Sequence, residues 1–61
     1  MMVKIYVNSC GWIVGRDKKG ELRYTKFKEG AKPFPNEYDK EFEICARQAE
    51  QAGYHIDKVR I

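Results

Sequence analysis

The first residues of the chain alternate between apolar and polar side chains. Val3, Ile5 and Val7 are each separated by one residue of more polar character, and this period of two is typical of a strand with one buried face. The turn-forming sequence NSCG at positions 8–11 follows, and the apolar run WIV at positions 12–14 comes directly after it. The pattern therefore predicts two short strands joined by a tight turn.

A second turn is predicted at positions 17–20, which read DKKG. An aspartate that opens a turn can accept hydrogen bonds from the backbone that follows, and Gly20 can adopt the positive φ that closes such a turn. Residues 22–28 then predict a third strand, with the β-favouring Tyr24 at its centre.

A helix is predicted after an irregular segment. Prolines at positions 33 and 35 disfavour both sheet pairing and a helix interior. Asn36 is a suitable N-cap, and Gly53 is suitable for the position that ends a helix. The apolar and small residues between them recur at intervals of three or four and share one stripe. They are Tyr38, Phe42, Cys45, Ala46, Ala49 and Ala52.

Residues 54–61 predict a final strand. The spacing of its apolar residues changes parity between Ile56 and Val59, so we expect a bulge, a twist or a short pairing there. The element order is then β-β-β-α-β in a single domain, residues 1–61. This order predicts a two-layer α+β fold, in which a three-stranded antiparallel meander and a C-terminal strand have one face covered by the helix and the other face open.

The length and composition restrict the possible classes of protein. A chain of 61 residues is near the lower limit for a domain that folds around one apolar core. Its apolar runs are too short for a signal peptide or a membrane span. We therefore expect a soluble, cytoplasmic protein with no membrane partner.

The charge is unevenly distributed along the chain. The formal net charge is +3, but residues 1–35 contain eight Lys or Arg against three acids, whereas residues 36–61 contain four against six. An acidic partner should therefore prefer the first part of the chain. The alternative is that these charges serve only to keep a small domain in solution.

Few residues are available for catalysis or for binding a metal. Cys10 and His55 are the one nucleophile and base pair worth considering, and we expect that they do not meet. The two cysteines, Cys10 and Cys45, form no CxxC pair, and with a single histidine the sequence suggests reduced thiols rather than a metal site. We expect no enzymatic activity, no catalytic residue and no cofactor.

Basic side chains and aromatic rings are mixed in the first half of the chain. A nucleic-acid surface needs both on the same exposed face. Alternation predicts that Tyr24 and Arg23 lie on opposite faces of the third strand, and that Trp12, Val14 and Arg16 share one side of the second. The candidate binding residues are Tyr6, Trp12, Arg16, Lys18, Lys19, Arg23 and Lys26.

Two classes of partner are compatible with these residues. Tyr6 is the best candidate for an exposed ring, whereas Trp12 is either a stacking platform or part of the core. Because stacking then depends on few rings, we favour a host protein as the partner, with nucleic acid as the alternative. A free edge strand would also permit a homodimer.

Several short motifs resemble those of small bacteriophage and prophage proteins. The motifs are Gly15-Arg16-Asp17, Tyr24-Thr25, the Ala-x-x-Phe step from Ala31 to Phe34, the alanine-bearing helix and Gly53-Tyr54. The resemblance covers most of the chain. It implies a phage or prophage origin for a small binding protein, and no particular activity.

Overall fold

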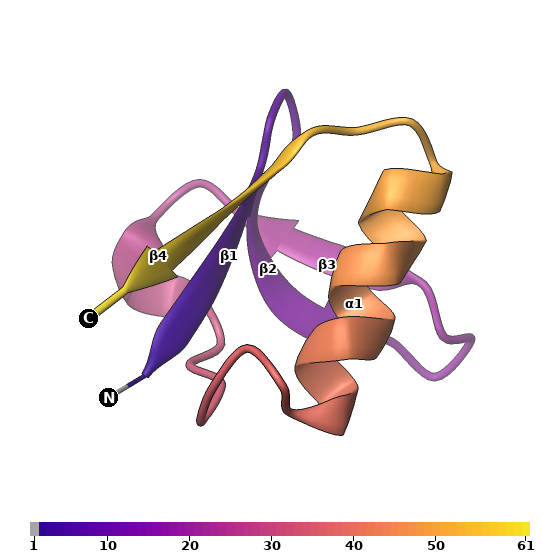
Figure 1. Ribbon diagram of the computed structural model, residues 1–61. Coiled ribbons are helices and arrows are strands. Elements are labelled where there is room, and N and C mark those ends of the chain that lie inside the picture. The colour runs from indigo at the N-terminus through magenta and orange to yellow at the C-terminus, as the bar shows by residue number, and fades with distance from the viewer. Residues whose placement is uncertain (1) are drawn as a thin grey trace.

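The computed structural model describes residues 2–61 and contains one antiparallel sheet of four strands packed against one helix (Figure 1). The strands are β1 (Val3–Val7), β2 (Gly11–Arg16), β3 (Leu22–Thr25) and β4 (Ile56–Arg60), in the order β3-β2-β1-β4. The α-helix α1 (Lys40–Gln51) and the 3₁₀ turn η1 (Lys28–Gly30) lie on opposite sides of β1 and β4 (Figure 1). The predicted α+β fold and element order are confirmed.

The ladder between β1 and β4 is regular, so of the bulge, twist or short pairing expected in the last strand, the bulge is absent. Its register runs without a shift from Val3 opposite Arg60 to Val7 opposite Ile56. Ile56 packs against the core, and Val59 lies on the other face. The change of parity therefore means that β4 contributes one apolar residue to each face. The irregularity occurs instead in β2, between Ile13 and Gly15.

The turn between β2 and β3 forms as predicted. The side chain of Asp17 accepts hydrogen bonds from the backbone N–H groups of Lys19 (2.8 Å) and Glu21 (3.0 Å). Gly20 has a φ of 83° and donates its N–H to the Asp17 carbonyl at 3.0 Å. The third strand ends at Thr25 rather than at Lys28, because the chain then bends to form η1.

The segment after η1 fills a gap between β1 and β2. These two strands pair only near their shared turn, where Tyr6 lies opposite Trp12. Further along, Val3 exchanges backbone hydrogen bonds of 2.9 and 2.8 Å with Phe34, and the Ile13 carbonyl accepts one of 3.0 Å from the N–H of Lys32. Residues 32–34 are therefore held by backbone hydrogen bonds to β1 on one side and to β2 on the other.

The helix begins at Lys40 and has Asp39 as its N-cap, so the prediction of Asn36 as the cap is wrong. The Asp39 carboxylate accepts hydrogen bonds from the N–H groups of Glu41 (3.1 Å) and Phe42 (3.2 Å). Asn36 instead closes a turn of its own by accepting a hydrogen bond of 2.8 Å from the N–H of Tyr38. An ionised cap at the positive end of the helix dipole is the more favourable choice.

Because the helix begins at Lys40, Tyr38 is not part of the buried stripe that the sequence predicted. Tyr38 lies before the cap and is 83% exposed. At the other end, Ala52 is exposed, and the N–H groups of Gly53 and Tyr54 close the helix by donating to the carbonyls of Glu50 and Ala49. The buried stripe consists of Phe42, Cys45, Ala46 and Ala49.

The core lies between this stripe and the α1 side of the sheet. Phe34 and Phe42 meet edge to face, with ring centroids 5.3 Å apart and an interplanar angle of 90°. Burying one such ring stabilises a domain by about 1.5–3 kcal/mol, which is a large share of what a chain of this size has. The remaining buried hydrophobic members of the core cluster are Val3, Ile5, Val7, Ile13, Cys45, Ala46 and Ala49.

Two glycines with positive φ provide a test of the close approach between β2 and β3. A Cβ atom on Gly11 (φ 117°) would lie 2.7 Å from the backbone oxygen of Thr25, whereas one on Gly20 (φ 83°) would meet nothing within 4 Å. We expect Gly20→Ala to lower the free energy of unfolding by about 1–2 kcal/mol, the cost of the left-handed conformation. Gly11→Ala should lower it further, because the backbone must also move. Urea unfolding followed by Trp12 fluorescence would measure both, and equal losses would contradict the proposed contact.

Candidate binding face

One surface of the sheet faces away from α1, and we call it the reverse face. Register places Lys4 beside Val59, Tyr6 beside both Asp57 and Trp12, and Trp12 beside Thr25. Each of these residues alternates with residues that are buried or packed against the core, so their side chains point to the opposite side. The reverse face consists of Lys4, Tyr6, Trp12, Arg23, Thr25, Asp57 and Val59.

Two aromatic rings lie together at the centre of the reverse face. Tyr6 and Trp12 come from neighbouring strands, with ring centroids 5.2 Å apart and an interplanar angle of 62°. Both side chains are half-buried. Trp12 is therefore neither part of the core between sheet and helix nor fully exposed. The pairing of the two rings fixes their positions before any partner arrives.

The turn η1 covers part of the reverse face beside these rings. The ammonium group of Lys4 donates a hydrogen bond of 2.7 Å to the carbonyl of Lys28. The ammonium group of Lys28 lies 6.0 Å from the centre of the Trp12 ring, within the range of a cation–π contact. Gly30 lies close to the side chain of Thr25. The reverse face is thus open only in part, and η1 adds a cation next to its rings.

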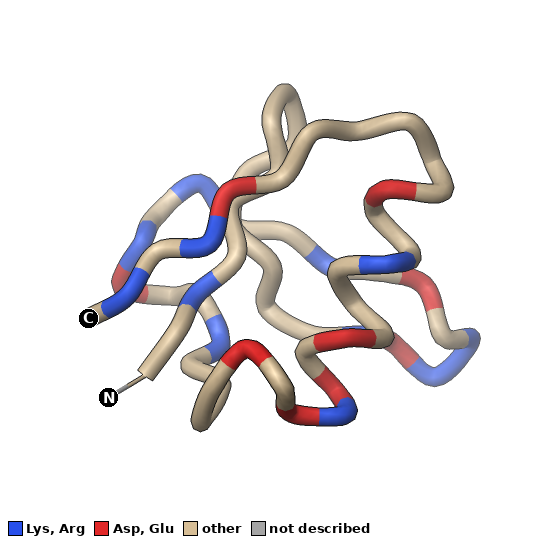
Figure 2. The backbone as a smooth tube through the Cα atoms, in the orientation of Figure 1, with Lys and Arg blue, Asp and Glu red and all other residues tan. Residues whose placement is uncertain are grey.

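Basic residues dominate the surroundings of this aromatic pair. Arg23 and Lys26 are exposed, on the reverse face and just after β3 respectively. Asp57 on β4 and Glu29 in η1 are the acids of this region. Figure 2 shows basic positions gathered around η1, the start of β1 and the end of β4, whereas acidic positions are concentrated along α1 and the segment before it.

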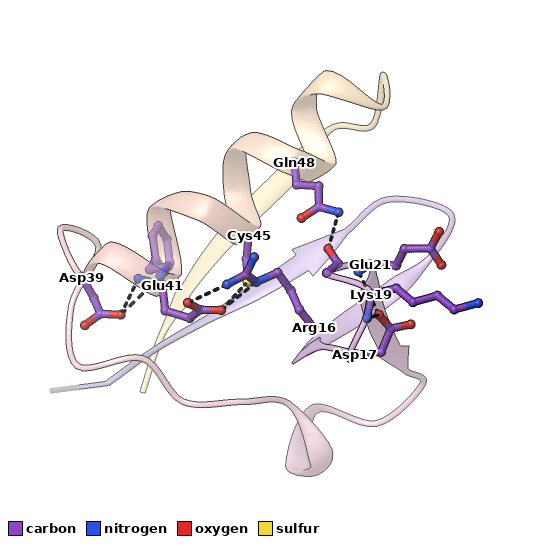
Figure 3. Close-up of polar contacts among 10 residues, drawn as sticks. Arg16, Asp17, Lys19, Glu21, Asp39, Glu41, Cys45 and Gln48 are labelled. Carbon is purple, nitrogen blue, oxygen red and sulfur yellow. Dashed lines mark hydrogen bonds and ion pairs between the residues drawn. The ribbon is translucent and has the colours of Figure 1, made fainter.

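Arg16 does not lie on the reverse face, although alternation predicted that it shares a side with Trp12. The irregularity between Ile13 and Gly15 shifts the parity of β2, and Arg16 turns toward α1 (Figure 3). Its Nε and Nη2 atoms donate to the carboxylate of Glu41 at 2.9 and 3.2 Å. These hydrogen bonds and the attraction between the charges raise the pKa of Arg16 and lower the pKa of Glu41.

Lys18 and Lys19 lie at the tip of the β2–β3 hairpin, away from the aromatic pair. Both are exposed, and Lys19 is held at its backbone by Asp17 (Figure 3). The tip is tied to the helix, because the side-chain amide of Gln48 donates a hydrogen bond of 2.9 Å to the carbonyl of Gly20. The structure thus brings together only part of the predicted set, Tyr6, Trp12 and Arg23, with Lys26 nearby in the chain.

Two basic residues of this region were missing from the predicted set. Lys4 alternates with the buried residues of β1, so its place beside Tyr6 follows from the same pattern that placed Tyr6. No pattern in the sequence predicts the position of Lys28. It lies beyond the end of β3, and only the path of the chain through η1 brings it to Trp12.

The thiols face the core side of the sheet. Burial raises the pKa of Cys45, and nearby Glu41 raises it further. Burial raises the pKa of Tyr24, with a further contribution from Cys10, and a hydrogen bond with Cys10 raises the pKa of Tyr54. Both cysteines are free. A thiol with a raised pKa is a weak nucleophile at neutral pH, so Cys45 is poorly suited to covalent chemistry.

Neither a metal-binding cluster nor a membrane-spanning helix is present among residues 2–61. No cluster of three or more His, Cys, Asp or Glu side chains is placed to hold a metal ion in that range. None of the helices in this part of the chain has the length and apolar character needed to cross a membrane.

Comparisons of the chain with protein-family models, with curated proteins and with solved structures find no match. The resemblance to phage and prophage proteins therefore stays a prediction.

The ion pair between Arg16 and Glu41 should make the stability of the protein depend on pH. The pKa of Glu41 is lowered in the folded state, so the pair stabilises fully above the usual carboxylate pKa, and its contribution is lost as the pH falls through the lowered value. We expect Arg16→Met to lower the urea midpoint at pH 7 and to have a smaller effect at pH 3.

Arg47→Met is the matched control for this prediction. Arg47 pairs with Glu43 at 2.8 Å, but both side chains are mostly exposed, and such pairs contribute little to stability. The control should therefore unfold close to wild type at both pH values. If Arg16→Met had the same effect at pH 3 as at pH 7, the ion pair would not be the cause of its destabilisation.

Proposed function

We propose that the protein is a small, non-enzymatic, cytoplasmic module that binds nucleic acid through its reverse face. The observation that supports this most directly is the aromatic pair of Tyr6 and Trp12, with the ammonium group of Lys28 next to the Trp12 ring. Cations that contact phosphates and rings that stack on bases are the two requirements of such a surface. The sequence suggested a face with few rings, and the second ring shifts the preference from a protein partner to nucleic acid.

The basic residues of this region are available for phosphates. Among residues 2–61, no ion pair joins Lys4, Arg23, Lys26 or Lys28 to a carboxylate. The carboxylates of Glu37, Glu41 and Glu43 are instead paired with other bases. A polyanion that approaches the reverse face therefore meets cations that are not engaged in ion pairs.

The salt dependence of binding tests this proposal. If the four bases that form no ion pair contact phosphates, the slope of log affinity against log salt should be about −3 for a single strand or about −3.6 for a duplex. Lys28→Gln should reduce that slope by about 0.7–0.9, whereas Lys40→Gln, which removes an exposed base on α1, should leave it unchanged. Fluorescence anisotropy with labelled oligonucleotides at 50–300 mM KCl would measure this slope for the wild type and for both variants. Absence of binding at the lowest salt would refute the proposal.

A protein partner is a second candidate, and the edge of β4 favours it. The backbone hydrogen bonds from Asn8 to His55 and from Ile61 to Met2 fix the phase of the ladder between β1 and β4. The even-numbered residues of β4 therefore direct their peptide groups away from β1. An extended segment of another chain, or a second copy of this one, can pair with such an edge.

A groove beside this edge could receive the side chains of an added strand. It lies between α1 and β4, has a volume of about 230 Å³, and is lined by Phe42, Ala46 and Ile56 together with charged residues that include Glu50 and Lys58. An added strand would direct alternate side chains toward this groove. A protein partner bound in this way would leave the reverse face accessible.

Lys58→Pro is a direct test of the β4 edge. The Lys58 N–H points away from β1, so proline at this position should block an added strand without breaking the existing ladder. We expect a pull-down from host lysate to lose its partner with Lys58→Pro and to retain it with the double variant Tyr6→Ala, Arg23→Glu. The opposite result would place the protein contact on the reverse face. Light scattering of the wild type would show whether the partner is a second copy.

A further inference from the structure

We infer that the nucleic acid bound by the reverse face is single-stranded and that an unpaired base stacks on Trp12. This inference rests on the proposed function, because it names the class of ligand for the same surface. It depends on three features of the structure: the position of the aromatic pair on the sheet surface, the position of Lys28 and the charge of the helix.

The aromatic pair can contact only a base whose flat side is exposed. Tyr6 and Trp12 lie side by side on the surface of a sheet and project from neighbouring strands. In a duplex, each base is covered above and below by its neighbours, so rings on a flat surface cannot reach the faces of the bases. In a single strand, the bases are free to turn outward and stack on aromatic side chains.

Lys28 occupies the place that a base would take. Its ammonium group lies 6.0 Å from the centre of the Trp12 ring, and the Lys28 carbonyl is fixed by the ammonium group of Lys4 at 2.7 Å. The backbone of η1 is thereby anchored, while the long Lys28 side chain can change its rotamer. When a base stacks on Trp12, the displaced ammonium group can contact the phosphate of the same nucleotide. One residue would then stabilise the free ring and bind the ligand.

The helix has the wrong charge to bind in the major groove of a duplex. Such a role requires basic side chains along the surface that enters the groove. The charged residues of α1 are Lys40, Glu41, Glu43, Arg47 and Glu50. Acids outnumber bases in this helix, and Arg47 is already paired with Glu43. A contact of α1 with the major groove of a duplex is therefore disfavoured.

Oligonucleotides of one length and sequence, single-stranded and as a duplex, test this inference by fluorescence anisotropy at low salt. We expect the single strand to bind at least ten-fold more tightly than the duplex. Trp12 is the sole tryptophan of the chain, so its fluorescence should be quenched by the single strand. Trp12→Leu should weaken binding of the single strand about 5- to 150-fold, the effect of losing one stacked base, and leave binding of the duplex almost unchanged.

Tyr38→Leu is the matched control, because it removes a ring that is 83% exposed and lies outside the reverse face. It should bind both oligonucleotides as wild type does. If Trp12→Leu does not fold, as judged by circular dichroism, the quenching of Trp12 in the wild type and the affinity of Trp12→Phe, which keeps a ring, still test the stacking. Trp12→Phe should then retain most of the affinity for the single strand.

The outcomes separate this inference from the proposed function. Equal affinity for the single strand and the duplex, with no quenching of Trp12, would overturn the inference and leave a phosphate-binding surface. Tighter binding of the duplex would overturn it as well. Absence of binding to either oligonucleotide at low salt would overturn both the inference and the proposed function.

Discussion

The insertion of residues 32–34 between β1 and β2 is the constraint on which the rest of the structure depends. The two strands separate beyond Tyr6 and Trp12, and their free backbone groups pair with Lys32 and Phe34 instead of with each other. This places the Phe34 ring in the core against Phe42. It also fixes the point at which the preceding segment leaves the sheet, so η1 must lie on the reverse face. The packing of the core and the position of Lys28 beside Trp12 thus have one cause.

The irregularity in β2 places two basic residues of the hairpin on opposite faces of the sheet. Because the parity of β2 changes between Ile13 and Gly15, Arg16 faces α1 and binds Glu41 (Figure 3). Arg23 on β3 remains on the reverse face. The contact between Gln48 and Gly20 holds the hairpin to the helix at a second point. The hairpin is thereby fixed to the helix by side chains that face the core layer, and the residues on its other side are free to contact a ligand.

The sequence predicts what depends on local patterns and misses what depends on the path of the chain. Period-two alternation was sufficient to place Tyr6 and Arg23 on the reverse face, and the DKKG turn formed as its residue types require. The N-cap was misassigned because Asn36 and Asp39 both have suitable side chains. Asn36 closes a turn of its own, and Asp39 accepts from the first N–H groups of the helix. The position of Lys28 has no local signal, since it results from pairing between Phe34 and Val3, which lie far apart in the sequence.

The reverse face is basic mainly because most acidic side chains of the chain make structural contacts in other parts of the molecule. Asp17 holds a turn, Asp39 caps the helix, and Glu41 pairs with Arg16. Glu37 lies within 3.8 Å of both Lys58 and Arg60. Each of these acids has a structural partner, so none of them pairs with Lys4, Arg23, Lys26 or Lys28. A domain of this size has few residues to spare for a binding site, and here the contacts that stabilise the fold also leave uncompensated cations beside an aromatic pair.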